Sequence, residues 1–363
     1  MQKERFQRAE KKLGYAALCK NLTAWRHESK TAFLMEAPTH PLQQALKDQE
    51  RAFANFFAGR SSFPRFKGKG RGDGFRYPDS KQIKLDEANN RIFLPKLGWL
   101  RYRNSRPVLG TIKNATVRRY NGRWFVSIQT EREVEIPQAK GNAIGIDVGV
   151  ARFATLSNGK VAEAKNNFRR KESALKKAQQ RMSRKTKFSK NWIKAKTKVQ
   201  RIHAGIANAR RDFLHKLSTE ISKNHAIVCV EELKVGNMSK SARGSRESPG
   251  KNVRAKSGLN KSILDQGWYE FRRQLSYKLE WNGGCLITVP AHNTSRTCPA
   301  CRFVSQDNRP SQEKFLCVEC GFAENADLVG AINILRAGLA RLACQANEAI
   351  RRQQEPSEAL LAR

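Results

Sequence analysis

The sequence predicts a multidomain protein that combines α/β and β architecture. Several long segments repeat apolar residues at steps of three or four, which is typical of amphipathic helices. Other segments form strand-like runs around Asn121-Gly122 and Asn158-Gly159, and Asn-Gly is a strong hairpin signal. Two Cys-x-x-Cys pairs follow near the C-terminus. With 363 residues, the chain is long enough for two or three domains, each with its own core.

The charge of the chain predicts a polyanionic partner. Lys and Arg number 70 against 32 Asp and Glu, a formal net charge of +38. Nucleic acid is the commonest partner of such a surface, and an anionic membrane is the alternative. No apolar run approaches the roughly 18 residues of a membrane span, and the N-terminus lacks the apolar stretch of a signal peptide. We therefore expect a cytoplasmic, nucleoid-associated protein with no membrane partner, although basic composition alone leaves catalysis open.

The first 137 residues change from helical to β patterns. Residues 1–60 read as helical, because Leu42, Leu46, Phe53 and similar residues recur at helical spacing. Residues 61–83 mix aromatic residues, glycines and cations. From about residue 84 to 137 the pattern is that of strands, with a short hairpin over 92–100 and a second one around Asn121-Gly122.

The second part of the chain alternates strands and helices. Strands are predicted at 143–148, 152–156, 226–230 and 285–289, helices at 262–281 and from Leu328, and a mobile loop at 239–261. Between 166 and 216 a helical hairpin carries 17 Lys/Arg and 2 Asp/Glu, a net charge of +15. Its apolar stripe indicates a packed seam. Its cations indicate a surface for nucleic acid, with solubility alone as the other explanation.

Three acidic residues stand at the ends of these elements. Asp147 ends an apolar strand between two glycines, Glu231 directly follows another, and Asp327 begins the last helix. Each has an ordinary structural explanation, since an Asp can close a turn and a helix N-terminus favours a carboxylate. Glu232 would point to the opposite face from Glu231, so only one of them can share a site with Asp147. Three acids at such ends in one region favour a shared metal site.

Carboxylates of this kind suit hard divalent cations. Mg²⁺ or Mn²⁺ prefers oxygen ligands, and a pair of ions about 3.5–4 Å apart can activate water and stabilise the leaving oxygen of a phosphodiester. None of the six histidines has neighbours that suggest a nucleophilic triad. His292 is nearest to the candidate site, and we expect it to be a core or surface residue.

The most specific local signal is the cysteine module. Cys298 and Cys301 form the first pair, Cys317 and Cys320 the second, with 15 residues between them. This spacing fits a tetrahedral four-cysteine zinc site without an open position, hence one structural Zn²⁺. Disulfides or a redox pair are the alternatives. The other four cysteines are scattered among apolar residues and are expected in cores.

Six motifs in order across about 60–340 resemble the TnpB family, the transposon-associated proteins ancestral to type V CRISPR effectors. They are Phe63-Pro64-Arg65-Phe66-Lys67 through Phe75-Arg76-Tyr77-Pro78, Leu94-Pro95-Lys96-Leu97-Gly98, Gly145-Ile146-Asp147-Val148-Gly149, Val230-Glu231-Glu232-Leu233, Thr294-Ser295-Arg296-Thr297-Cys298, and Ala326-Asp327 leading to Ala331-Ile332-Asn333-Ile334. Together these motifs cover nearly the whole chain. The chain departs from the family at Arg302, where glycine is usual, and at Gly330, where asparagine is common, and both changes are expected to be tolerated.

The resemblance implies a RuvC-like (ribonuclease H-like) nuclease domain with an inserted four-cysteine zinc ribbon, preceded by a wedge-type β-barrel and a helical recognition lobe. The domains expected on this basis are the helical lobe (1–60), the wedge barrel (61–138), the nuclease core with its basic hairpin (139–293), the zinc ribbon (294–323), the last nuclease helix (324–345) and a polar tail (346–363). Family members usually begin with a β-strand, whereas Met1 falls in helical sequence, so the wedge is expected to lack its first strand.

The family also implies a function, an RNA-guided DNA endonuclease of an insertion sequence. Asp147, Glu231 and Asp327 would be its catalytic acids, with two Mg²⁺ or Mn²⁺ ions, one structural Zn²⁺, a guide RNA from the transposon end and target DNA. Candidate nucleic-acid contacts are Arg65, Lys67, Lys69, Arg76 and Arg296, the last expected near the active site. One alternative is a guide-dependent DNA-binding regulator without cleavage, which the presence of all three acids disfavours. The other is an RNA-independent transposase or structure-specific nuclease.

Overall fold

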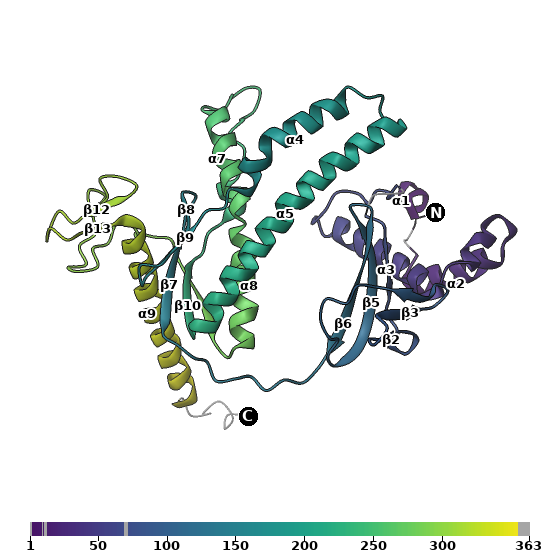
Figure 1. Cartoon of the computed structure of the whole chain (residues 1–363), viewed down its shortest axis with the longest axis horizontal. Coiled ribbons are helices and arrows are strands. Elements are labelled where there is room, and N and C mark those ends of the chain that lie inside the picture. The colour runs from purple at the N-terminus through teal and green to yellow at the C-terminus, as the bar shows by residue number, and fades with distance from the viewer. Residues whose placement is uncertain (1, 9, 11–12, 69–71, 355–363) are drawn as a thin grey trace. The chain divides into compact units, whose positions relative to one another are not determined.

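The computed structural model describes residues 2–8, 10, 13–68 and 72–354, and the chain divides into two compact units (Figure 1). The first unit is Met1–Val134 and the second is Glu135–Arg363. Each unit has its own secondary structure and its own core, and each is described by itself below. Among the residues that the structure describes, no helix combines the length and hydropathy needed to cross a bilayer.

The first unit begins with helices, as the sequence indicated. They are α1 (Gln2–Gln7), α2 (Tyr15–His27), the 3₁₀ helix η1 (Ser29–Met35) and α3 (Thr39–Phe57). Leu18 and Leu22 of α2 and Phe53 of α3 are buried. Phe6, Phe56 and Phe63 form a cluster of rings at centroid distances of 5.2–5.8 Å, which ties the ends of this helical region together.

Two three-stranded antiparallel sheets follow in the same unit. One has the order β1-β5-β6, formed by Gly74–Tyr77, Thr111–Tyr120 and Arg123–Glu131. The other has the order β2-β3-β4, formed by Lys84–Asp86, Arg91–Leu94 and Gly98–Arg101, with the 3₁₀ helix η2 (Ser80–Gln82) before it. Tyr120 pairs with Arg123, so the predicted Asn121-Gly122 hairpin is confirmed. Both sheets contribute to one core.

The second unit is built on a mixed five-stranded sheet of order β11-β10-β7-β8-β9. The strands β7 (Ala143–Val148), β8 (Arg152–Leu156) and β9 (Val161–Glu163) form an antiparallel meander. The strand β10 (Ile227–Glu231) runs parallel to β7 on one side and to β11 (Cys285–Val289) on the other. The carboxyl ends of β7, β10 and β11 therefore meet at one edge of the sheet.

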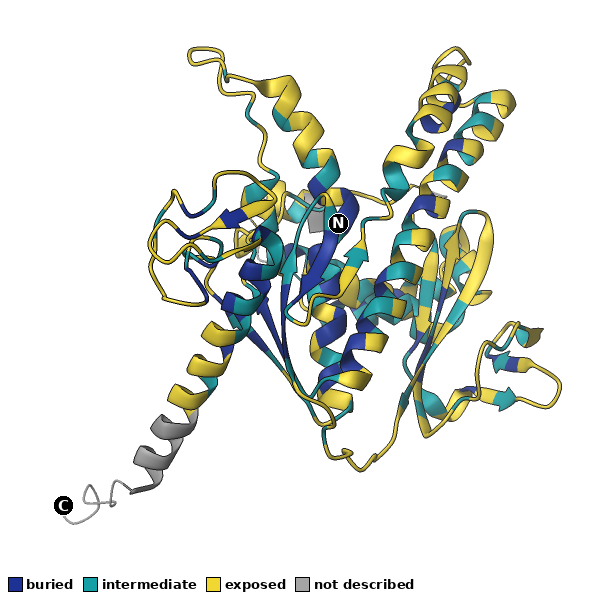
Figure 2. Cartoon of the chain, turned by 60° about the vertical axis from the view of Figure 1, so that its left-hand side comes forward, coloured by how far each residue is buried: buried dark blue, intermediate teal, exposed yellow. Residues whose placement is uncertain are grey.

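Helices cover both faces of this sheet. On one face, Ile144, Ile146 and Val230 pack with α5 (Lys190–Asn224) and α8 (Trp268–Trp281) in one core cluster. On the other face, Cys229 and Ile287 pack with α9 (Ala326–Gln354). Figure 2 shows the buried residues gathered along the strands and on the sides of the helices that face them. Alternation along each strand decides which side chains reach which helix, because successive residues point to opposite faces.

Glycine lets α9 lie directly on the sheet. A Cβ built at Gly145 would fall 2.1 Å from the carbonyl oxygen of Ala331 and 2.7 Å from the backbone nitrogen of Leu335. A Cβ built at Gly338 would fall 2.2 Å from Sγ of Cys229. These contacts fix the position of α9 against β7 and β10, and hence the position of its N-terminus.

The predicted basic helical hairpin is present. It consists of α4 (Asn167–Ser183) and α5, joined by a short connection in which Ser189 caps α5 by accepting a hydrogen bond from the backbone N–H of Trp192. Leu175, Ala178 and Val199 are buried between the two helices. The Lys and Arg residues of the hairpin are mostly exposed, so its charge faces solvent.

Between β10 and β11 the structure corrects two predictions. The short α6 (Val235–Met238) leads to a loop that ends earlier than predicted, because α7 (Val253–Gln266) occupies part of 239–261. Lys256 and Asn260 of α7 donate hydrogen bonds to the carbonyls of Met238 and Ser239, which hold the loop against the helix. The single helix predicted over 262–281 is in fact two, because Gly267, at φ +76°, ends α7 before α8 begins.

Candidate active site

Asp147 lies near the carboxyl end of β7 on the face covered by α9. Its Oδ2 would lie 2.8 Å from a Cβ built at Gly330, so the carboxylate occupies the space that a side chain at that position would need. Burial is the largest cause that raises the pKa of Asp147 to about 7, and the negative charges of Glu231 and Asp327 contribute to the same rise. Arg309 and a hydrogen bond from the backbone of Val148 oppose this rise. The site therefore holds more negative charge than it can stabilise without a cation.

Glu231 ends β10, the strand adjacent to β7. Val230 is in register with Ile146, so Glu231 follows at the level of Asp147 and on the same face. The hydroxyl of Thr294 donates a hydrogen bond to Oε1 of Glu231. Glu231 is half-buried, whereas the side chain of Glu232 is exposed. Thr294 thus fixes the orientation of one carboxylate at this edge of the sheet.

Asp327 is in the first turn of α9. Its backbone N–H donates to Oδ1 of Asn325 at 3.1 Å, a contact that caps the helix at this end. Oδ1 of Asp327 lies 3.7 Å from Nη2 of Arg309, and about 28% of each side chain is exposed. Because α9 lies against β7, its N-terminal turn faces the carboxyl edge of the sheet. The positive end of the helix also favours the ionised carboxylate.

The structure brings these three predicted acids into one electrostatic environment, since Glu231 and Asp327 both act on Asp147. They are not a preformed single-ion cage. In the described part of the chain, only the four cysteines form a set of metal-ligating residues whose ligand atoms all lie within 4.8 Å of one another.

Sequence reasoning gave no role to three residues that support the site. Arg309 comes from the cysteine module and contacts Asp327. Asn333 of α9 is buried and its Nδ2 donates to the carbonyls of Thr294 and Thr297, at 2.8 and 2.7 Å. Thr294 in turn binds Glu231. Thr294 and Asn333 both lie in the family motifs, which was the available signal, whereas nothing in the local pattern around Arg309 marks it.

The candidate nucleic-acid contacts are spread over both units. Arg65, Lys67 and Arg76 are exposed residues of the first unit, and Lys69 lies outside the described residues. Arg296 is exposed in the second unit, two residues after Thr294, and its side chain therefore lies in the segment that borders Glu231. His292 is also exposed and contacts the side chain of Asn293.

The four predicted zinc ligands form one cluster. Sγ of Cys298 lies 3.6 Å from Sγ of Cys320, and Sγ of Cys301 lies 3.5 Å from Sγ of Cys317. A tetrahedral ion with Zn–S bonds of 2.3 Å would separate its sulfurs by about 3.8 Å, so the donor set fits Zn²⁺. The hairpin of β12 (Lys314–Leu316) and β13 (Ala323–Asn325) carries the second pair.

Each cysteine pair ends in a left-handed residue. Arg302 follows Cys301 with φ +67°, and Gly321 follows Cys320 with φ +71°. A residue with a Cβ is strained in this conformation, which explains why glycine is usual where this chain has Arg302. The strain is small enough for the module to form.

Arg302→Gly is therefore expected to raise the unfolding free energy by about 0.5–1 kcal/mol, since relief of strain exceeds the entropy that glycine adds to the unfolded chain. Thermal unfolding of the full chain, saturated with zinc, measures this change. Gly321→Arg is the matched reverse substitution and should destabilise the protein. An Arg302→Gly variant that melts at a lower temperature would contradict the account of strain.

Comparison with known proteins identifies relatives across the chain. The family model OrfB_IS605, "Probable transposase", matches residues 126–242, and the model "Cas12f1-like, TNB domain" matches residues 268–334. A solved structure, "Cryo-EM structure of the Cas12f1-sgRNA-target DNA complex", is 16% identical with a TM-score of 0.47, and the match covers 82% of this chain and 70% of that one.

Two curated relatives match over nearly the full length. The protein named "Putative RNA-guided DNA endonuclease InsQ" of Escherichia coli (strain K12) is 52% identical over 366 residues, which cover 99% of this chain and 90% of the relative. A "Putative RNA-guided DNA endonuclease" of Streptomyces pristinaespiralis is 35% identical over 353 residues, which cover 96% and 83%. From this identity and coverage, together with the two matching domain models, we conclude that the chain belongs to the TnpB family.

Proposed function

We propose that this protein is an RNA-guided DNA endonuclease of an insertion sequence, which hydrolyses phosphodiester bonds at a site made by Asp147, Glu231 and Asp327. One observation carries the proposal. Carboxylates from two adjacent strands and from the N-terminus of α9 act on one another at the carboxyl edge of the sheet. They do so in a chain that is 52% identical to a protein named as an RNA-guided DNA endonuclease.

The acids would hold two Mg²⁺ or Mn²⁺ ions. When bound, such ions lower the pKa of water and stabilise the negative charge that develops on the phosphodiester oxygens. The residues of the chain have distinct tasks around them. Asp147 and Glu231 provide ligands from neighbouring strands, and Asp327 provides one from α9. Thr294 holds Glu231 in one orientation, and Arg309 balances the charge of Asp327.

The exposed cations would bind the guide RNA and the target DNA. The hairpin of α4 and α5 concentrates positive charge, and an RNA–DNA heteroduplex can be held through its backbone while base pairing reads the sequence. Arg296 lies two residues after Thr294, which contacts Glu231, and would bind the DNA strand at the active site. Arg65, Lys67 and Arg76 would bind nucleic acid on the first unit.

The domain roles follow from this function. The mixed sheet with its helices would be a RuvC-like nuclease domain, and the four-cysteine module a structural zinc ribbon. The two sheets of the first unit would be the wedge barrel, and α1–α3 the helical recognition lobe. Thr294 and Arg309 support this division of labour, because the ribbon and the segment leading into it contribute contacts to the carboxylates.

Copurified RNA gives the direct test. The protein is expressed with its flanking DNA, purified, and its bound RNA sequenced; a discrete species from the transposon end is expected. The loaded protein is then given plasmids that carry a guide-matched target beside a randomised motif, with Mg²⁺ or with EDTA. Guided binding without cleavage would favour the regulator, and cleavage without RNA would favour the unguided nuclease.

A further inference from the structure

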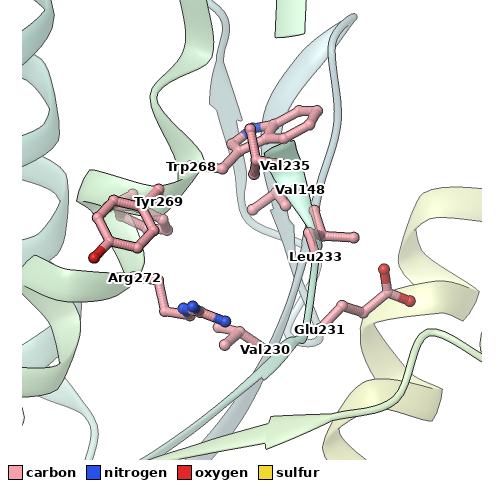
Figure 3. Close-up of a pocket in the computed structure, with 9 residues that line it drawn as sticks. Val148, Val230, Glu231, Leu233, Val235, Trp268, Tyr269 and Arg272 are labelled. Carbon is pink, nitrogen blue, oxygen red and sulfur yellow. The ribbon is translucent and has the colours of Figure 1, made fainter. Parts of the chain in front are cut away.

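A small pocket adjoins the candidate active site on the other face of the sheet. Glu231, Val148 and Val230 are among the residues that line it (Figure 3). The carboxylate of Glu231 turns away from the pocket, toward the yellow ribbon of α9, while the side chains of Trp268 and Arg272 lie on the pocket side. The pocket and the carboxylates therefore share one edge of the sheet, separated by the end of β10.

The N-terminal turns of α8 give this pocket an unusual wall. Trp268 is 6% exposed, and its indole N–H is buried without a hydrogen-bond partner among the described residues. An unsatisfied buried donor is unfavourable and marks a place where an acceptor is missing. The ring of Tyr269, next along the helix, is 65% exposed.

Arg272 completes the wall one turn further along α8, on the same side as Tyr269. Its guanidinium has no salt-bridge or hydrogen-bond partner within the described part of the chain. Its neighbour Arg273 differs, because it makes a two-point ion pair with Glu270 at 2.7 and 2.8 Å. Of these two neighbouring arginines, Arg273 is held in an ion pair and Arg272 is free to bind a ligand.

We propose that this pocket receives the nucleobase that adjoins the scissile phosphate in the DNA strand being cut. The base stacks on Tyr269, and Arg272 binds the neighbouring phosphate. Apolar walls, a flat exposed ring and an unpaired cation together match a nucleotide. The position beside Glu231 makes it a neighbour of the reacting phosphate on the same strand.

This inference rests on the proposed function and adds a subsite to it. It gives Tyr269 and Arg272 a positioning role, since neither touches the reacting phosphorus. The carboxylates alone hold metal and phosphate but do not fix the direction in which the strand crosses the sheet edge. A base held in the pocket fixes that direction and brings the phosphodiester into line with its attacking water.

A cleavage experiment tests the stacked base. A guide-loaded protein cuts a target that carries either a normal nucleotide or an abasic one beside the scissile phosphate. Tyr269→Ala is expected to slow single-turnover cleavage of the normal target by about tenfold. The abasic target should slow the wild type by a similar factor but should slow Tyr269→Ala no further, because both changes remove the same contact. Additive losses would overturn the proposal.

Two matched variants separate this contact from general effects. Trp281→Ala removes an exposed ring from the other end of α8, and Arg273→Ala removes the arginine that is paired with Glu270. Both should cut either target at the rates of the wild type, whereas Arg272→Ala should lose about tenfold on both targets. Equal losses in Arg272→Ala and Arg273→Ala would mean that the pocket arginine has no special role. Melting temperatures confirm that each variant is folded.

A crosslinking experiment does not depend on cleavage. The full chain with Asp147→Asn is irradiated with single-stranded DNA that contains 5-iododeoxyuridine, and the crosslinked peptide is identified by mass spectrometry. A crosslink at Tyr269 or Trp268 that Tyr269→Ala reduces at least fivefold, and Trp281→Ala does not, supports the pocket. Crosslinks only at other residues overturn it. Should the wild type cut no DNA while the crosslink maps here, the endonuclease proposal fails, and the pocket is a DNA-binding site without a role in cleavage.

Discussion

Asp147→Asn is expected to reduce DNA cleavage by at least about 1,000-fold while leaving RNA binding intact. Asparagine has the shape of aspartate and fits the same space beside Gly330, so the variant changes charge rather than packing. It removes an anionic ligand shared with Glu231 and Asp327, and the stabilisation that bound metal gives the transition state amounts to several kcal/mol. Single-turnover cleavage of a guide-matched target, with RNA binding measured in parallel, shows the result.

The matched control for this variant is Asp212→Asn. Asp212 lies on α5, is exposed and pairs with Lys216 one turn away, so its loss should leave cleavage unchanged. Cleavage by Asp147→Asn at the rate of the control would remove Asp147 from the catalytic site. Cleavage lost in both would instead indicate that charge anywhere in this unit affects activity.

Asp147→Asn is expected to raise the unfolding free energy at neutral and basic pH, although it lowers cleavage. The pKa of Asp147 rises from 3.8 to about 7 in the folded protein, so the folded state holds this proton more tightly than the unfolded state. Without metal, the unfolding free energy should therefore fall as pH rises from about 4 to about 7 and stay low above that, by up to about 4 kcal/mol from this group. Asp147→Asn should lack this decline and be more stable than the wild type at pH 8.

Added Mg²⁺ should make the wild type more stable than Asp147→Asn at pH 8. Because the ion competes with the proton on Asp147, it should raise the melting temperature of the wild type more at pH 8 than at pH 6, and should raise that of Asp147→Asn little at either pH. Thermal unfolding at four combinations of pH and metal measures this. A wild-type stability that rises from pH 5 to pH 8 without metal would contradict the assigned environment of Asp147.

Local patterns were enough to predict most strands. The segments 143–148 and 152–156 were predicted with the bounds of β7 and β8, because apolar runs end there at glycine or at a turn. Alternation also predicted that only one of Glu231 and Glu232 could share a site with Asp147. In the structure Glu231 and Asp147 face the α9 side of the sheet, where Gly330 lies against Asp147. The assignment of the three acids as catalytic residues stays a prediction, tested by the variants above.

Contacts between distant segments could not be read from such patterns. Gly267 divides the predicted helix of 262–281, and a Cβ built there would lie 3.1 and 3.2 Å from the side chains of Arg210 and Leu214 on α5, contacts that the local pattern does not reveal. Arg309 reaches Asp327 from a loop of the cysteine module, and Thr294 reaches Glu231 across 63 positions of sequence. Neither contact belongs to a repeating pattern, because each is set by where two elements happen to end in space.

Loss of zinc from the cysteine module should affect cleavage as well as local structure, because the module contacts the residues around the carboxylates. Cys317→Ser should release zinc, because serine is a poor ligand for this ion and Cys317 is 2% exposed, with no room for a substitute ligand from solvent. Without the ion the module loses the bond energy that holds it folded, and Arg309 and the segment after Thr294 lose their support.

We expect cleavage by Cys317→Ser to fall at least about tenfold and the module to become sensitive to protease. Cys344→Ser, an exposed cysteine of α9 outside the cluster, should retain one zinc per chain and full activity. Elemental analysis that finds equal zinc in both variants would show that Cys317 is not a ligand, whereas lost zinc with unchanged cleavage would show that the carboxylates keep their geometry without the module.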